Sequence, residues 1–333
     1  MPDARALLAP ILALHDRIRD AVVAASEAQA SAALAAVDRD DDGDTIYAID
    51  RVSEETLVEG LLDVARDEPL WVLAEGLPPG GIGLPHGIAE GACPWRVLVD
   101  PIDGTRGLMY QKRPAWVLTG VAPNRGPATR LRDIVLAVQT EIPLVKQHLS
   151  DQLWAVRGEG SFARRRNRVS GEVNGFTPRP SQADTIAHGF SSVVRFFPGA
   201  RDVLAAIDDA LVTQVLGPPV AGKAACFEDQ YMSTGGQLYE LAMGHDRFVA
   251  DLRPEMAPIL AARGVPLPLC CHPYDLCTAL IAEQLGVVLT DADGAPLDGP
   301  FDLEAALSWV GYANEGLRQR VEPALREAIR RLA

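Results

Sequence analysis

The chain has 333 residues, of which 48% are hydrophobic and 23% charged, a balance typical of a globular protein with a sizeable core. Its formal net charge of −14 argues against nucleic acid or an anionic membrane as the main partner. The five cysteines form no C-x-x-C pair, which favours free thiols over a disulfide framework. The first residues lack the order of a signal peptide, and no apolar run could span a bilayer, so we expect a cytoplasmic protein.

The N-terminal region predicts helices, an acidic turn and a strand. Residues 4–37 are rich in alanine and carry apolar side chains at helical spacing, which predicts one or two amphipathic helices. The stretch Asp38–Asp44 begins like an EF-hand calcium loop but has Ile49 where that loop needs a glutamate. We interpret it as a solvated acidic turn and leave Ca²⁺ binding open. Residues 45–50 then alternate like a strand that ends at Asp50, and a capped helix is predicted from Ser53 to about Arg66.

Two strand-like apolar segments end in carboxylates. Leu70–Ala74 is followed by Glu75, and Val97–Val99 is followed by Asp100 and Asp103. If the two strands are neighbours in one sheet, these acids meet at its carboxyl edge, where layered α/β proteins bind ligands. Such close carboxylates repel one another unless a cation lies between them. Hard oxygen ligands without His or Cys favour Mg²⁺, Mn²⁺ or Ca²⁺ over zinc, so the sequence predicts a divalent-metal site at this edge.

The rest of the chain alternates strands and helices without an internal repeat. Segment 77–94, rich in Gly and Pro, predicts a surface loop. The basic segment Arg164–Pro180 predicts a solvated hairpin tip, with contact to an anionic substrate as the alternative. Strands are expected near 115–121, 134–138, 152–156, 185–189, 247–251 and 308–313, and helices near 200–215, 237–243 and 275–286.

Each acid also has a purely structural interpretation when taken alone. Asp50 and Glu75 could be surface residues at turns, and Asp275 could be the N-cap of its predicted helix, where the helix dipole favours a carboxylate. The functional interpretation therefore depends on their combination.

In order and spacing these residues resemble the inositol monophosphatase superfamily of metal-dependent, lithium-sensitive phosphatases. The resemblance is strongest at Asp100-Pro-Ile-Asp-Gly-Thr105 with Glu75 before it, and at Tyr274-Asp275 with the helix that follows; Ser233-Thr-Gly-Gly236 is a weaker match. It implies an α/β fold, a layered αβαβα sandwich, with an N-terminal lobe (1–184) that holds most metal ligands and a C-terminal lobe (185–333) that completes the site. The implied activity is Mg²⁺-dependent hydrolysis of a small phosphorylated metabolite by a metal-activated water.

The resemblance also implies a role for each matching residue. Asp50 and Thr105 would form the catalytic pair that orients and deprotonates the water. Two or three Mg²⁺ ions, with Mn²⁺ as an alternative, would be held by Glu75, Asp100, the Ile102 carbonyl, Asp103 and Asp275. The phosphate would be held by backbone N–H groups of Gly104 and Thr105. The leaving alcohol would lie toward Ser191, Ser192, Gly235, Gly236 and Asp251.

The chain departs from the family pattern mainly on the alcohol side. Gly107-Leu108 replaces the usual Asn-Phe, Asp251 replaces a glutamate, and Gly76 stands where a second glutamate is common. The alternatives are therefore a nucleotide 3′-phosphatase, a sugar bisphosphatase or a catalytically silent metal-binding relative. A haloacid dehalogenase phosphatase is disfavoured because its two signature aspartates have one residue between them, whereas Asp100 and Asp103 have two. No nucleic-acid or membrane partner is expected, and a homodimer is left open.

Overall fold

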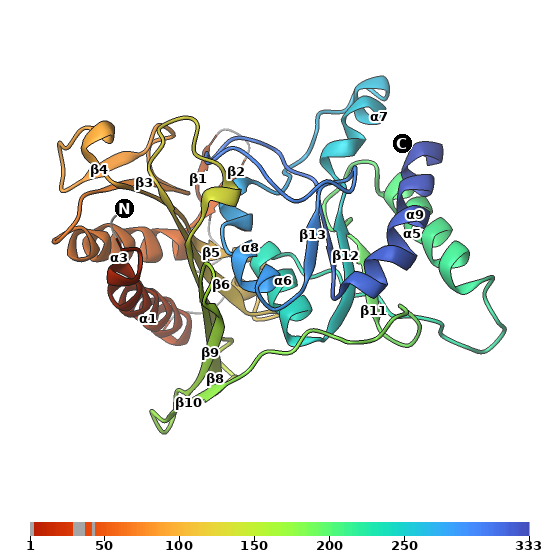
Figure 1. Cartoon of the computed structure of the whole chain (residues 1–333), viewed down its shortest axis with the longest axis horizontal. Helices are drawn as coiled ribbons and strands as arrows, with labels where there is room; N and C mark the ends of the chain where they lie inside the picture. The colour runs from red at the N-terminus through yellow and green to blue at the C-terminus, as the bar shows by residue number, and fades with distance from the viewer. Residues whose placement is uncertain (1–2, 29–36, 42–43, 333) are drawn as a thin grey trace.

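A computed structural model describes residues 3–28, 37–41 and 44–332, with the backbone alone for 37–41, 44–55 and 332 (Figure 1). Two β-sheets are flanked and separated by helices, so that five layers follow one another across the molecule. The predicted layered α/β fold is confirmed. The helices of the outer layer on the large sheet are α1 (Arg5–Ala28) and α3 (Ala48–Val64), those between the sheets are α6 (Thr234–Met243) and α8 (Ala279–Glu283), and those on the small sheet are α5 (Arg201–Leu216) and α9 (Glu315–Leu332).

The large sheet has eight strands in the order β10-β9-β8-β7-β6-β5-β3-β4. Strands β3 and β5 run parallel, with Ala74 paired to Val99, so Glu75 and Asp100 follow at the same edge, as the sequence predicted. The other pairs are antiparallel. The strands are β3 (Leu70–Ala74), β4 (Ile82–Leu84), β5 (Trp95–Asp103), β6 (Ala115–Pro123), β7 (Leu136–Ile142), β8 (Leu149–Val156), β9 (Gly160–Asn167) and β10 (Val173–Phe176).

The small sheet has four strands in the order β11-β12-β14-β13. They are β11 (Phe190–Val193), β12 (Asp246–Asp251), β13 (Val288–Thr290) and β14 (Trp309–Tyr312), and β11 runs parallel to β12. A separate hairpin joins β1 (Val37–Asp41) and β2 (Asp44–Tyr47). The boundary predicted near residue 184 falls between the last strand of the large sheet and the first of the small sheet; the division into two lobes stays a prediction.

The burial of β5 and of one face of α1 accounts for the apolar patterns of these segments in the sequence. All nine residues of β5 are buried, because helices cover both faces of the large sheet, and this accounts for its unbroken apolar run. On α1 the apolar residues at helical spacing are all buried, among them Leu7, Ile11, Leu14 and Ile18. One core cluster lies between α1, α3 and the large sheet, and the other includes the space between the two sheets.

Several predicted boundaries are wrong. Helix α3 begins at Ala48 instead of Ser53, so Asp50 lies in its first turn and not at a strand end. The helix dipole favours a carboxylate in the first turn of a helix, which is consistent with the position of Asp50. The predicted loop 77–94 contains strand β4, which is only three residues long and so gives little periodic signal.

Three further segments differ from prediction. The basic segment after Arg164 is a hairpin, but its first residues belong to β9 and not to the tip. The strand expected from Thr185 begins only at Phe190. The helix expected from Asp275 is split into a 3₁₀ turn, η4 (Pro273–Leu276), and α8. Within the part of the chain that the structure describes, no helix is both long enough and apolar enough to cross a membrane.

Candidate metal centre

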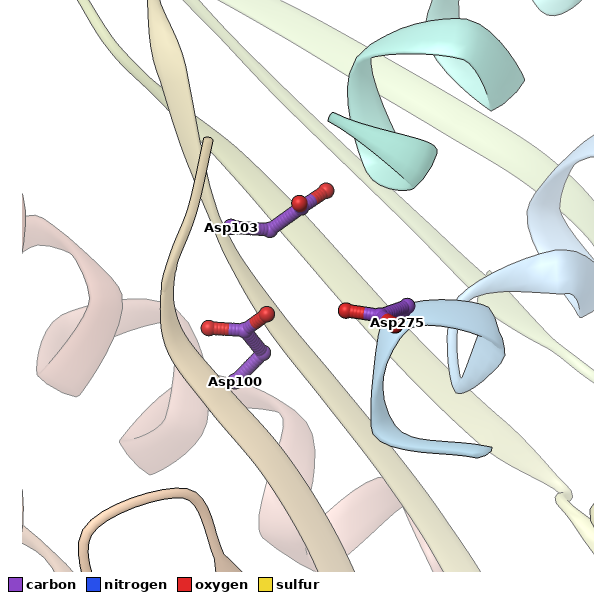
Figure 2. A group of neighbouring side chains, drawn as sticks. All are labelled: Asp100, Asp103 and Asp275. Atoms are coloured by element: carbon purple, nitrogen blue, oxygen red, sulfur yellow. The ribbon is translucent and has the colours of Figure 1, made fainter. Parts of the chain in front are cut away.

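Three carboxylates converge where β5 ends (Figure 2). Asp100 and Asp103 lie on β5, on either side of an irregularity in its pairing with β6, and Asp275 comes from η4 in the second half of the chain. One carboxylate oxygen from each lies within 4.8 Å of the others. The structure therefore brings together residues that are more than 170 positions apart in the sequence.

Asp103 is held by the amino end of α6. Its Oδ2 accepts hydrogen bonds from the Ser233 hydroxyl (2.8 Å) and the Gly235 backbone N–H (2.6 Å). A Cβ on residue 235 would lie 2.6 Å from Leu118 Cδ2 and 3.0 Å from Asp103 Oδ2, so only glycine allows this approach. Ser233 also caps α6 by accepting the N–H of Gly236 at 2.8 Å. Gly235 thus binds the carboxylate directly and Gly236 binds the serine that holds it, and the contact of both glycines with substrate stays a prediction.

The other two carboxylates are also oriented by backbone N–H groups. Asp100 Oδ1 accepts the N–H of Ile102 at 2.9 Å. Asp275 Oδ2 accepts the N–H of His272 at 2.6 Å, which caps the η4 turn. The predicted N-cap position of Asp275 is wrong, because His272 is the N-cap of η4 and Asp275 is its third residue, whose carboxylate accepts the N–H of the N-cap. The same side chain also lies beside Asp100 and Asp103. In each of these two carboxylates a hydrogen bond from a backbone N–H to one oxygen orients the side chain.

Electrostatics make this cluster unfavourable without a cation. Burial, together with the nearby carboxylates of Glu75, Asp103 and Asp275, raises the pKa of Asp100 well above its ordinary value. Burial and Asp275 raise the pKa of Asp103 to about 8, although the hydrogen bonds from Ser233 and Gly235 act in the opposite direction. In the described part of the chain, neither Asp100 nor Asp103 forms a salt bridge with a basic side chain.

The donor atoms suit a hard divalent ion. Carboxylate oxygens are the ligands that Mg²⁺, Mn²⁺ and Ca²⁺ prefer. Cys277 lies near the three acids, and burial together with their charges raises the pKa of its thiol well above the ordinary value. The residues present therefore fit the predicted Mg²⁺ or Mn²⁺.

The remaining predicted ligands lie beside this group. Glu75 directly follows β3, is half-buried, and is close enough for its charge to raise the pKa of Asp100. The Ile102 carbonyl accepts the Thr105 hydroxyl at 2.9 Å. Gly104 has a left-handed backbone (φ 96°), which turns the chain from β5 into helix α4 (Thr105–Met109). The predicted pairing of Thr105 with Asp50 cannot be followed, because the Asp50 side chain lies outside the described residues.

Of the residues predicted to face the leaving alcohol, Ser191, Ser192 and Asp251 lie outside the group of three carboxylates. Ser191 and Ser192 are each 3% exposed, on strand β11. Asp251 ends β12, is completely buried, and binds the Arg253 guanidinium at 2.6 Å. Neither Arg253 nor Ser233 was among the predicted site residues, although Ser233 begins the weaker match to the family. The signal for Ser233 was its position as an N-cap before two glycines; for Arg253 it was a basic residue two positions after a strand-ending acid.

No family model matches the sequence, and no curated protein matches it. Among solved structures, the extragenic suppressor protein SuhB from Bartonella henselae is 17% identical, with a TM-score of 0.66 over 97% of this chain and 99% of that one. An IMPase from Thermotoga maritima is 15% identical (TM-score 0.62, 98% and 99%). Fructose-1,6-bisphosphatase from Leishmania major is 14% identical (TM-score 0.68, 99% and 96%). Each likeness extends over nearly the whole of both chains and at these identities concerns the fold.

Proposed function

We propose that this chain, which has the fold of the inositol monophosphatase superfamily, is a divalent-metal-dependent phosphomonoester hydrolase acting on a small phosphorylated metabolite. The observation that carries the proposal is the convergence of Asp100, Asp103 and Asp275, two of them buried, at the carboxyl end of β5. A charged cluster of this kind stores unfavourable energy unless a cation occupies it, and such clusters are typical of functional sites.

Asp100, Asp103 and Asp275 would hold the metal, with Glu75 and the Ile102 carbonyl as further ligands. When bound, divalent ions neutralise the phosphate dianion, lower the pKa of the attacking water and stabilise the leaving oxygen. We propose Mg²⁺ as the ion, with Mn²⁺ as an alternative, and lithium sensitivity as in the family that the sequence resembles.

The chain itself contributes orientation. Ser233 and Gly235 fix Asp103, and the His272 N–H fixes Asp275, so these acids are positioned before any ion arrives. The turn at Gly104 starts α4 immediately beside the acids, and the amino end of a helix attracts phosphate oxygens. Thr105, the first residue of this helix, would orient and deprotonate the attacking water together with Asp50.

A sugar bisphosphatase is the second candidate. It is favoured by the similarity to the Leishmania major fructose-1,6-bisphosphatase, whose TM-score of 0.68 is comparable to the 0.66 of SuhB. Both candidates use the same centre and differ only in the alcohol that leaves.

The test is phosphate release from a panel of phosphomonoesters with Mg²⁺, with and without Li⁺. The panel holds inositol 1-phosphate, adenosine 3′,5′-bisphosphate, fructose 1,6-bisphosphate and histidinol phosphate. We expect Mg²⁺-dependent, Li⁺-inhibited release from at least one ester, and none from the Asp103→Asn variant. Silence across the panel in a wild-type protein that binds Mg²⁺ would favour the catalytically silent alternative, and equal activity in Asp103→Asn would refute the site.

A further inference from the structure

The basic run of strand β9, which the proposed active site does not use, lies against helix α1. Alternate residues of a strand face opposite sides of its sheet. Arg165 binds Asp151 on the side where Tyr239 of α6 contacts the same carboxylate. Arg164 pairs instead with Asp16 of α1 at 3.1 Å, and Arg168, just beyond β9, pairs with Glu27 of α1 at 2.5 Å. Arg165 therefore lies on the α6 side of the large sheet, and Arg164 and Arg168 lie on the α1 side.

A pocket of about 530 Å³ opens on the α1 face of this strand. Its walls come from the second half of α1, from residues 145–148 between β7 and β8, and from the end of β9. Lys146, His148, Arg166 and Arg168 supply basic groups to the lining, and Val23 and Ala24 supply an apolar wall.

The acids of this pocket are already engaged. Glu27 binds Arg168, and Asp20 binds Arg19 at 2.9 Å. Over residues 3–28 and 56–331, where side chains are described, Lys146, His148 and Arg166 form no salt bridge and no side-chain hydrogen bond. Lys146 and Arg166 thus place two uncommitted positive charges at the pocket, on a chain whose net charge is −14. Holding like charges together is unfavourable unless an anion compensates them.

We propose that this pocket binds a phosphorylated small molecule as an effector, at a site separate from the acidic centre. Lys146, Arg166 and Arg168 are the donors to its phosphate, since ammonium and guanidinium groups form strong charge-assisted hydrogen bonds with phosphate oxygens. Val23 and Ala24 contact its less polar part. The Arg168 guanidinium is held in place by Glu27 and by the Gln147 carbonyl at 2.8 Å, so part of the site is preorganised.

The pocket is connected to the segment that follows the acidic centre. The Val145 N–H donates to Gln111 Oε1 at 2.8 Å, and Gln111 Nε2 donates to the Leu108 carbonyl of α4 at 3.0 Å. Strand β7 ends and β6 begins at the same edge of the sheet, where Ile142 pairs with Ala115. An anion that orders the Lys146 loop therefore also orders α4, whose first residue is Thr105.

The first experiment measures binding of inorganic pyrophosphate by calorimetry, with the full chain in EDTA. Without divalent ions the cluster at Asp103 repels anions, so binding reports on the basic pocket. The Lys146→Gln/Arg166→Gln variant should bind at least about tenfold more weakly, because two charge-assisted contacts are lost. The control is Lys223→Gln/Arg331→Gln, which removes the same charge at two exposed positions elsewhere. We expect it to bind like wild type.

Two results would overturn the proposal: no pyrophosphate binding by wild type, or equal weakening in both double variants. The second result would mean that net charge alone attracts the anion. Circular dichroism and the unfolding midpoint establish that each variant is folded.

The connection is tested by hydrogen exchange of residues 105–111 in EDTA, a readout that needs no phosphatase activity. Pyrophosphate should slow exchange there in wild type. Gln111→Asn keeps a residue that tolerates the left-handed backbone at this position (φ 53°) but is too short to reach both partners. We expect this variant to bind pyrophosphate without the added protection. Equal protection in both proteins would refute the connection.

Discussion

Asp103 and Asp251 are both buried acids near strand ends, and their surroundings are opposite. Asp103 is 7% exposed, accepts hydrogen bonds from Ser233 and Gly235, and faces two further carboxylates. Asp251 is 0% exposed and binds the Arg253 guanidinium, whose Cζ atom lies 4.7 Å from the ring centre of Phe196. One acid has a cation from its own chain, and the other lacks one within the described residues.

This difference distinguishes an acid that stabilises the fold from an acid that is a candidate metal ligand. A buried carboxylate with its own guanidinium is complete, and removal of either partner leaves an uncompensated charge. A buried carboxylate that faces other carboxylates is incomplete until an ion arrives, and it contributes little to the stability of the metal-free fold. The two aspartates should therefore respond in opposite ways to the same substitution.

The largest expected effect is on the activity of Asp103→Asn. The neutral side chain removes one metal ligand, and loss of several kcal/mol of transition-state stabilisation corresponds to a fall in kcat/KM of about 10³-fold or more. Metal-free stability should be unchanged or higher, because the cost of burying an acid whose pKa is raised on folding is gone. The assay is phosphate release from the ester that the panel identifies, with Mg²⁺ affinity by calorimetry as a second readout. Wild-type affinity and activity in this variant would contradict the comparison.

Asp251→Asn should instead destabilise the protein. It leaves the buried Arg253 without its counter-charge, for which we expect a loss of about 3 kcal/mol in the free energy of unfolding. Urea unfolding measures this loss. Adding Arg253→Met to the same chain should restore part of it, since the buried charge is then removed as well. If Asp251→Asn were as stable as wild type, the ion pair of Asp251 and Arg253 would not contribute to the free energy of unfolding.

The pH dependence of metal-free stability should also show that the acidic cluster contains a carboxyl group with a raised pKa. The pKa of Asp103 is raised from 3.8 to about 8, so between these values the folded state holds a proton that the unfolded chain has released. The free energy of unfolding therefore falls as pH rises through this window, by at most about 1.4 kcal/mol per pH unit for one group. Urea unfolding at pH 5 and pH 8 in EDTA should show this fall in wild type and a smaller one in Asp103→Asn. An identical fall in both would assign it to other acids.

The smallest expected effect comes from Ser233→Ala. The variant loses the cap of α6 and one hydrogen bond to Asp103, which together should cost about 1–2 kcal/mol of stability. Ser191→Ala is a matched control, because that serine is equally buried but its hydroxyl has no hydrogen-bond partner in the described part of the chain. Thermal unfolding should show a lower midpoint for Ser233→Ala and little change for Ser191→Ala. Equal shifts would mean that the Ser233 hydrogen bonds contribute nothing specific.

The sequence by itself determined the parts of this protein that depend on local patterns. The apolar run of β5 and the spacing of the buried residues on α1 record which faces are covered. Glu75 directly follows β3, and Asp100 and Asp103 lie at the end of the neighbouring β5, each after an apolar run. This is why the metal side of the candidate site could be predicted. Boundaries such as the start of α3 were less certain because helix and strand signals overlap there.

Only the tertiary structure decided which side chains meet across the layers. Ser233 reaches Asp103 from 130 positions away, and Arg164 reaches Asp16 from 148 positions away. Periodicity shows that a residue is buried or exposed, but it does not show what lies opposite. For this reason the sequence did not show that Asp251 is paired with Arg253, and its predicted contact with the substrate stays a prediction. For the same reason the sequence predicted a solvated hairpin tip for the arginines of β9, whereas Arg166 lines a pocket beside α1.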